Sequence, residues 1–135
     1  MQLTWTNRRV LIVEDNAIVA MPLVAHLEDC GAEVIGPVPT LDAALAGLEE
    51  DAQIDGAVLD VELGSDKVWP LALTLTRREI PFVFATGSAE DCLFPPSLLT
   101  YPRFVKPYAE EVVADALLTL IAAAPAKRDG LLSAA

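Results

Sequence analysis

The sequence predicts an α/β fold in which five parallel strands form an open, doubly wound sheet. Short aliphatic runs alternate along the chain with segments of helical length, which is the pattern of successive β-α units. The aliphatic runs are almost continuous, as is typical of parallel strands buried on both faces. Five such units favour an open sheet, because a closed barrel of parallel strands needs about eight.

The predicted strands are the most apolar short segments of the chain. They comprise residues 9–14, 33–35, 56–60, 82–85 and 103–105. Gly36 and Pro37 are expected to end the second strand, and Pro81 is expected to open the fourth. The segment 61–67, which contains Gly64, is predicted to be a loop.

Four segments have the length and the end signals of helices. They comprise residues 16–30, 41–50, 68–78 and 110–124. Asn16 is a suitable N-cap for the first helix, and Gly31 is a suitable residue just beyond its end. Pro22 lies past the first turn and is expected to kink this helix. Thr40 is a suitable N-cap for the second helix, and Pro70 falls in the first turn of the third, where proline is tolerated.

The connection between the fourth and fifth strands is unusual in composition. Three prolines and a glycine lie between residues 86 and 102, so this segment is predicted to hold at most one short or irregular helix. The last helix has acidic residues in its first turn, where the helix dipole favours them.

Length and charge limit the classes of function. The 135 residues fit one domain, predicted at 9–124, with an N-terminal extension at 1–8 and a flexible tail at 125–135. The formal net charge is −11, which argues against binding to nucleic acids or anionic membranes and suits basic partners or metal cations. We find no apolar segment typical of a secretory signal or a membrane span, so a cytoplasmic location is expected.

Polar residues follow four of the five predicted strands, at the point where each strand ends. They are Glu14 and Asp15, Asp60, Thr86 and Lys106. The carboxyl ends of parallel strands lie at one edge of a sheet, where ligands of open α/β sheets bind. The sequence therefore predicts that three carboxylates, a hydroxyl and an ammonium group converge at this edge.

The charges of this group predict its chemistry. Three carboxylates against one lysine leave about two negative charges, which a hard divalent cation such as Mg²⁺ would balance. A lysine and a hydroxyl next to such a cation suit a phosphoryl group, which one carboxylate could attack in line. Asp60 is the better nucleophile, because it stands alone at a strand end before a loop with Gly64. Glu14 and Asp15 are adjacent and are better suited to holding the metal.

With these motifs the chain resembles the response regulator receiver domains over residues 9–124. The resemblance is carried by VLIVED with its acidic pair, LDVELGSD with Asp60, FATG with Thr86, and VKPY with Lys106. It implies a flavodoxin-like (βα)5 sandwich with strand order 2-1-3-4-5. The segment PFVFATGSAED is similar to a narrower subclass, the single-domain receivers of alphaproteobacteria that carry a PFxFATGY motif.

The resemblance also implies roles for the individual residues. Asp60 would accept a phosphoryl group from a sensor histidine kinase or a histidine phosphotransfer protein, and Thr86 and Lys106 would contact that group. Asp15, Asp60 and the backbone carbonyl of Glu62 would ligate Mg²⁺, with Glu14 acting mainly through bound water. Such a protein would catalyse only its own phosphorylation and dephosphorylation. Because eleven residues follow Ala124, its output is expected through a protein partner or as a phosphate sink.

Two residues depart from the pattern of the family. Arg103 stands three positions before Lys106, where receivers often have a switch aromatic, and Ser88 stands where the subclass has tyrosine. The sequence leaves open whether Arg103 changes the switch, and which of the aromatic residues Tyr101, Phe104 and Tyr108 would then move.

Two other functions remain open at this point. A small phosphatase or phosphotransferase with an aspartyl-phosphate intermediate needs a second acid two residues after the nucleophile, and Glu62 has that spacing. A flavodoxin-type cofactor binder needs a hydroxyl- and glycine-rich loop after the first strand, whereas this chain has acids there.

Overall fold

A computed structural model of the chain describes residues 4–50, 53–87 and 94–124. Five parallel strands form the main sheet: β1 (Arg9–Val13), β2 (Glu33–Val38), β3 (Gly56–Asp60), β6 (Phe82–Thr86) and β7 (Arg103–Val105). Their order is β2-β1-β3-β6-β7. The labels β4 (Glu62–Leu63) and β5 (Asp66–Lys67) belong to a separate antiparallel hairpin, so the sheet has the expected order 2-1-3-4-5.

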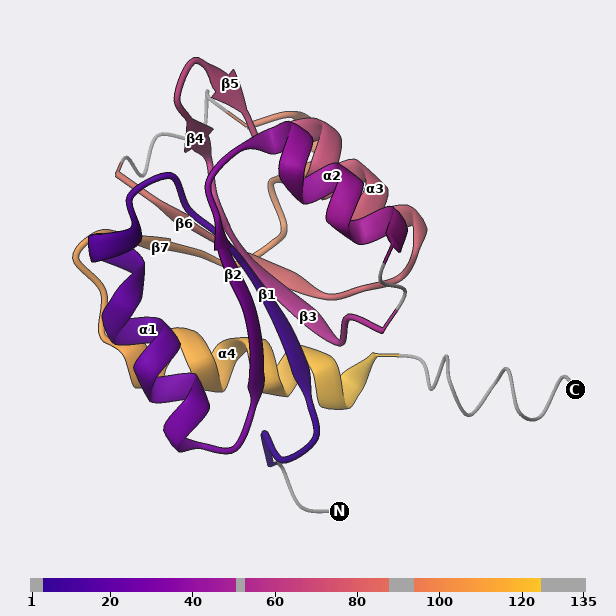
Figure 1. Cartoon of the computed structure of the whole chain (residues 1–135). Helices are drawn as coiled ribbons and strands as arrows, with labels where there is room; N and C mark the ends of the chain where they lie inside the picture. The colour runs from indigo at the N-terminus through magenta and orange to yellow at the C-terminus, as the bar shows by residue number, and fades with distance from the viewer. Residues whose placement is uncertain (1–3, 51–52, 88–93, 125–135) are drawn as a thin grey trace, which may run out of the picture.

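The sheet is covered on both faces, as the aliphatic strands predicted (Figure 1). The helices are α1 (Ala17–Asp29), α2 (Leu41–Glu50), α3 (Trp69–Arg77) and α4 (Glu110–Ala123). Alternate residues of each strand point to opposite faces. Leu11 and Leu59 pack with α2 and α3 in one core, whereas Ile12 and Val58 pack with α1 and α4 in the other.

The ends of the helices match the expected capping. The Asn16 side chain accepts hydrogen bonds from the N–H groups of Ile18 and Val19, and Thr40 caps α2 in the same way through Ala43. Gly31 follows α1 with a φ of 101°, the left-handed conformation that favours glycine. Pro22 lies inside α1, which runs without interruption around it, and the expected kink stays a prediction.

Two predicted boundaries are wrong. The strand β2 does not end at Ile35 but continues to Val38, because a bulge opposite β1 absorbs the irregular Gly36–Pro37 step. Gly36 has a φ of 114°, and a Cβ atom there would lie 2.5 Å from the carbonyl oxygen of Ile12, so the step requires glycine. The predicted loop at 61–67 contains the hairpin β4–β5, which turns at Gly64 with a φ of 62°.

The connection between β6 and β7 contains a single 3₁₀ turn, Pro96–Leu98, in the part that the structure describes. This agrees with the expected short or irregular helix; residues 88–93 and the expectation on Ser88 lie outside the described residues. Aromatic rings hold the segment to the sheet: Phe94 packs on Trp69 and Phe84, and Tyr101 stacks on Phe82 at 4.1 Å between ring centroids.

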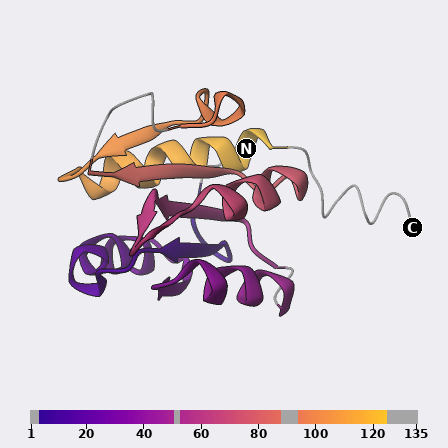
Figure 2. The same ribbon diagram turned by 90° about the horizontal axis from the view of Figure 1, so that it is seen from above.

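A residue near the N-terminus contributes to the hydrophobic core. Trp5, within the predicted N-terminal extension, is 4% exposed and packs in the core under α1 and α4. Figure 2 shows that the strands of the main sheet point to one side of the molecule and that α4 ends on the opposite side. Among the described residues, none of the helices has both the length and the apolar character needed to span a bilayer.

Candidate functional site

The carboxyl edge of the sheet brings together the acids that the sequence placed there. One carboxylate oxygen from each of Glu14, Asp15 and Asp60 lies within 4.8 Å of the other two. Glu14 and Asp60 are buried, at 5% and 6% exposure, whereas Asp15 is exposed. Asp60 is the last residue of the central strand β3, and the other two follow β1, its neighbour in the sheet.

Lys106 is the cation of this cluster. Its Nζ lies 2.6 Å from Oε1 of Glu14 and 3.4 Å from Oδ2 of Asp60. The side chain is anchored through the backbone, because the Lys106 N–H donates to the carbonyl oxygen of Thr86 at 2.8 Å. The position of Lys106 therefore depends on the end of β6, one strand away from Asp60.

Each of the two acids that follow β1 also has a local hydrogen-bond partner that fixes its position. The backbone N–H of Asn16 donates to Oε2 of Glu14 at 3.1 Å, at the start of α1. The backbone N–H of Gly64, in the turn of the β4–β5 hairpin, donates to Oδ2 of Asp15 at 3.0 Å. The hairpin thus reaches back to β1 and holds one wall of the site.

The remaining predicted residues occupy distinct positions. Thr86 is 3% exposed at the end of β6, next to the strand that carries Asp60. The carboxylate of Glu62 does not join the cluster, because it pairs with Lys67 Nζ at 2.9 Å across the hairpin. The Glu62 backbone still acts on Asp60, since its N–H lowers the pKa of that carboxyl. Its carbonyl remains a predicted metal ligand.

Burial and crowding change the acid strengths. Burial, followed by the hydrogen bond and the negative charge of Glu14, raises the pKa of Asp60 from 3.8 to about 7, although Lys106 opposes this. The Gly64 N–H lowers the pKa of Asp15. Burial would lower the pKa of Lys106, but its hydrogen bond to Glu14 and the charge of Asp60 outweigh this and raise it. The raised pKa of Asp60 thus indicates that Lys106 only partly offsets its burial and the negative charge of Glu14.

Arg103 is the first residue of β7 and packs against the segment that precedes this strand. Its guanidinium lies over the Phe94 ring, 4.3 Å from the centroid, and donates to the carbonyl oxygen of Leu99 at 3.3 Å. It connects the fifth sheet strand to the 3₁₀ segment.

Sequence reasoning missed two parts of the site. The contact of Lys106 with a phosphoryl group stays a prediction, and the ion pairs of Lys106 with Glu14 and Asp60 were not foreseen. Sequence reasoning also missed the Gly64 contact with Asp15, although Gly-Ser between Leu63 and Asp66 is a hairpin signal that was visible.

The comparison with solved structures places this arrangement among known proteins. SdrG from Sphingomonas melonis Fr1 is 37% identical, with 90% of this chain and 99% of that chain covered and a TM-score of 0.72. SdrG in a BeF3-activated conformation, from a source named Pseudomonas melonis Fr1, is 38% identical over 86% of this chain and 98% of that one, with a TM-score of 0.68. The HemR receiver domain from Leptospira biflexa is 26% identical over 85% and 94%, with a TM-score of 0.70.

Comparisons with family models and with curated proteins gave no match. The structural relatives cover nearly the whole chain and include proteins described as receiver domains, and their fold agrees with the strand order found here. The subclass suggested by PFVFATGSAED stays a prediction. On fold and on identity to its relatives, the chain belongs to the response regulator receiver domains.

Proposed function

We propose that this protein accepts a phosphoryl group on Asp60 from a phosphohistidine, in a reaction that needs Mg²⁺. The donor would be a sensor histidine kinase or a histidine phosphotransfer protein in the cytoplasm. The protein would then signal through contacts with a partner, or drain phosphate from its donor. It would catalyse only its own phosphorylation and dephosphorylation.

The observation that carries the proposal is the setting of Asp60. It is buried at the end of the central strand, with Lys106 Nζ at 3.4 Å and two further carboxylates close by. A purely structural acid would gain nothing from a position that raises its pKa to about 7. Strongly perturbed groups at the ligand-binding edge of an α/β sheet are candidates for function.

The donor set fits a magnesium ion. Carboxylate oxygens are the ligands that Mg²⁺ takes in proteins, and it uses one or two of them while keeping several waters. Asp15 and Asp60 would supply these oxygens, the Glu62 carbonyl a third protein ligand, and Glu14 would contribute through water. Bound Mg²⁺ would supply positive charge to the phosphoryl oxygens and to the crowded acids.

In the transfer, a bond forms between a carboxylate oxygen of Asp60 and phosphorus. The bond between phosphorus and the donor histidine nitrogen breaks, and its electron pair stays on the imidazole. Lys106 is within reach to balance charge on the phosphoryl oxygens, as its contact with Asp60 indicates. The Thr86 hydroxyl, at the adjacent strand end, would donate to one of these oxygens.

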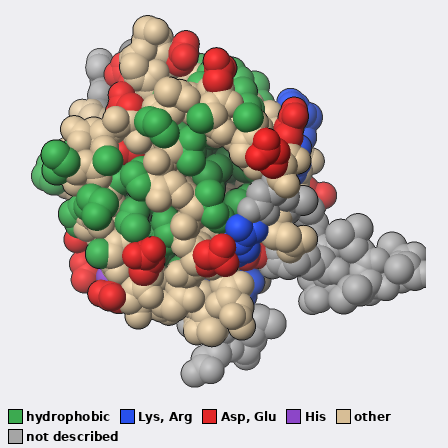
Figure 3. All heavy atoms as spheres, viewed as in Figure 1, with side chains coloured by type: hydrophobic (Ala, Val, Ile, Leu, Met, Phe, Trp, Pro, Cys, Tyr) green, Lys and Arg blue, Asp and Glu red, His purple; other side chains and the backbone are tan. Residues whose placement is uncertain are grey.

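A protein donor needs a surface beside Asp60, and α1 offers one. Its first turns begin directly after the acidic pair and expose Ile18 at 82% and Met21 at 55%. Figure 3 shows hydrophobic side chains gathered on this face of the molecule. Ile18 and Met21 lie three residues apart on one side of the helix, so a partner could cover both at once.

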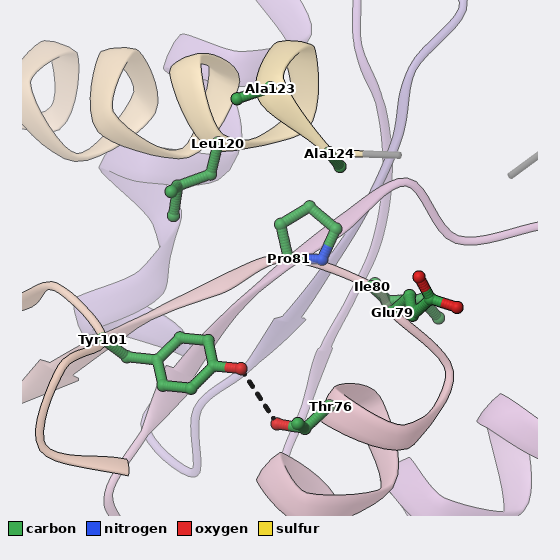
Figure 4. A pocket seen from close by; sticks show the side chains of 8 residues that line it. All are labelled: Thr76, Glu79, Ile80, Pro81, Tyr101, Leu120, Ala123 and Ala124. Atoms are coloured by element: carbon green, nitrogen blue, oxygen red, sulfur yellow. Dashed lines mark hydrogen bonds between the residues drawn. The ribbon is translucent and has the colours of Figure 1, made fainter. Parts of the chain in front are cut away.

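The phosphatase alternative has less support. It needs Glu62 as the second acid, and that carboxylate is engaged with Lys67 instead. The hollow lined by Pro81, Tyr101 and Ala124 (Figure 4) lies at the opposite edge of the sheet, so it is not a substrate pocket for Asp60.

The test is phosphorylation by a small donor. The protein is incubated with acetyl phosphate, with Mg²⁺ or with EDTA, and the intact mass is measured. Wild type and Asp115→Asn, a matched change on the exposed side of α4, should each gain one phosphoryl group with Mg²⁺ only. Asp60→Asn should gain none. Equal labelling of Asp60→Asn would refute the proposal, and steady release of phosphate over many turnovers would favour the enzyme instead.

A further inference from the structure

An apolar hollow of about 370 Å³ lies at the edge of the sheet opposite to Asp60 (Figure 4). It lies between the end of α3, the start of β6, the chain before β7 and the last turn of α4. Pro81 and Leu120 contribute apolar surface, and Ala123 is an exposed residue of its lining. Its volume falls within the range of small-molecule sites in proteins.

The wall that contains Tyr101 is held in place from two directions. The Tyr101 ring stacks on Phe82 of the core, at 4.1 Å between ring centroids. Its hydroxyl shares a hydrogen bond of 3.1 Å with the hydroxyl of Thr76, which also lines the hollow (Figure 4). The hollow is thus formed in advance, and an apolar group that enters it gains free energy by leaving water.

Glu79, at the rim, is the one charged residue among the described residues that line the hollow. It follows α3 and has a φ of 60°. Its N–H donates to the carbonyl oxygen of Thr76, and the N–H of Ile80 donates to that of Leu75, both at 3.0 Å. This is the Schellman pattern of helix ends, in which the position of Glu79 is usually occupied by glycine.

The end of α1 has the same pattern with the usual residue. There the N–H of Gly31 donates to the carbonyl oxygen of Glu28, and the N–H of Ala32 donates to that of Leu27, both at 3.0 Å. A side chain is unfavourable in this left-handed conformation, because its Cβ approaches the following carbonyl oxygen. The rim of the hollow therefore carries a carboxylate where glycine would give the more stable helix end, and such local strain is typical of functional positions.

From these observations we propose that the hollow binds a small organic cation, an ammonium group carried on an apolar body. The Glu79 carboxylate pairs with the ammonium group. The apolar body lies against Pro81, Leu120 and the Tyr101 ring. Complementary charge selects a cation over a neutral or anionic ligand, and the net charge of −11 attracts cations to the protein. This site does not rest on the phosphate chemistry of the opposite edge.

Titration of the full chain with three probes of similar shape, followed by the amide signals in NMR spectra, tests the site. The probes are phenethylammonium, neutral 2-phenylethanol and anionic 3-phenylpropionate. Phenethylammonium should shift the amides of Thr76, Ile80 and Tyr101, with a dissociation constant in the millimolar range that is usual for so small a ligand. The alcohol should bind about fivefold more weakly, as the loss of one exposed ion pair implies, and the carboxylate should bind least.

Four variants separate the carboxylate from the apolar walls. Glu79→Gln and Glu79→Gly should both reduce the preference for the ammonium over the alcohol to about twofold or less. Glu79→Gly should also raise Tm by about 4 °C, because it removes a side chain from the left-handed conformation. Ala123→Leu should fill the hollow and weaken binding of the ammonium and the alcohol alike. Glu28→Gln, an equal change of charge on the exposed surface of α1, should behave as wild type.

Four outcomes would overturn the proposal. The first is equal binding of the ammonium and the alcohol by wild type, and the second is a preference for the ammonium that persists in Glu79→Gln. The third is a wild type as stable as Glu79→Gly, which would remove the reason to assign Glu79 to a ligand. The fourth is that the peptide acetyl-Leu-Lys-Leu-amide binds about tenfold or more tightly than phenethylammonium in a manner that needs Glu79. That result would assign the hollow to a basic segment of a partner protein.

Discussion

Replacing Asp60 with asparagine should stabilise the metal-free protein at alkaline pH. The change removes one carboxylate from a crowded acidic cluster and keeps the size of the side chain. A shift of the Asp60 pKa from 3.8 to about 7 corresponds to about 4 kcal/mol if none of it is screened. The cluster is open to water on the side of exposed Asp15, so we expect about half of this, about 2 kcal/mol.

The effect should depend on pH in a defined direction. Below about pH 4, Asp60 is protonated in the folded and in the unfolded chain and contributes no difference. Between pH 4 and 7 the unfolded chain releases the proton while the folded protein keeps it, so the folded state loses stability as pH rises. The advantage of Asp60→Asn should therefore be close to zero at about pH 4 and complete above about pH 7.

Thermal unfolding with EDTA, at several pH values, measures this advantage. About 2 kcal/mol corresponds to a rise in Tm of about 8 °C for a domain of this size. Adding Mg²⁺ should stabilise the wild type more than the variant and so reduce the difference. The reasoning is refuted if Asp60→Asn is the less stable protein in EDTA at pH 8, or if the difference does not change with pH. Asp115→Asn should show neither effect.

Three further changes probe other parts of the site. Lys106→Met should leave Glu14 and Asp60 without their cation and lower the rate of phosphorylation by acetyl phosphate by about 100-fold or more, as losing one charge-stabilising group typically does. An unchanged rate would show that Lys106 takes no part in the reaction. Gly64→Ala should lower the free energy of unfolding by about 1 kcal/mol, because the φ of 62° at this position disfavours a side chain. It should also disturb the contact of the Gly64 N–H with Asp15 and so weaken Mg²⁺ binding, which calorimetry measures. Ile18→Ser with Met21→Ser should slow transfer from a phosphorylated protein donor but not from acetyl phosphate, and equal slowing with both donors would contradict the docking role of α1.

The central strands of the fold could be predicted because their burial determines their sequence. Residues 56–60 are entirely buried, and the expected strand has the observed bounds. The edge strand 103–105 also has the expected bounds although it is only partly buried, because Pro102 and Pro107 limit it from both sides. The direction of the chain in parallel strands then places their polar ends at one edge, which is why the acidic cluster could also be predicted.

The errors arose where tertiary contacts override local signals. Gly36 and Pro37 normally end a strand, but β1 offers a partner that accommodates them as a bulge. The hollow at the edge of the sheet opposite to Asp60 is formed by segments distant in sequence, and no local pattern indicates it. The pairing of Lys106 with Glu14 depends on side-chain packing between β1 and β7, which are not neighbours in the sheet.

The position of the phosphoryl group on the chain decides whether Asp60 is the acceptor. After reaction with acetyl phosphate and Mg²⁺, borohydride converts an aspartyl phosphate to homoserine, and tandem mass spectrometry of the peptides identifies the residue. We expect homoserine at position 60 and unchanged acids at positions 14 and 15. Homoserine at position 15, or the 5-hydroxynorvaline that a glutamyl phosphate would give at position 14, with Asp60 intact, would contradict this expectation.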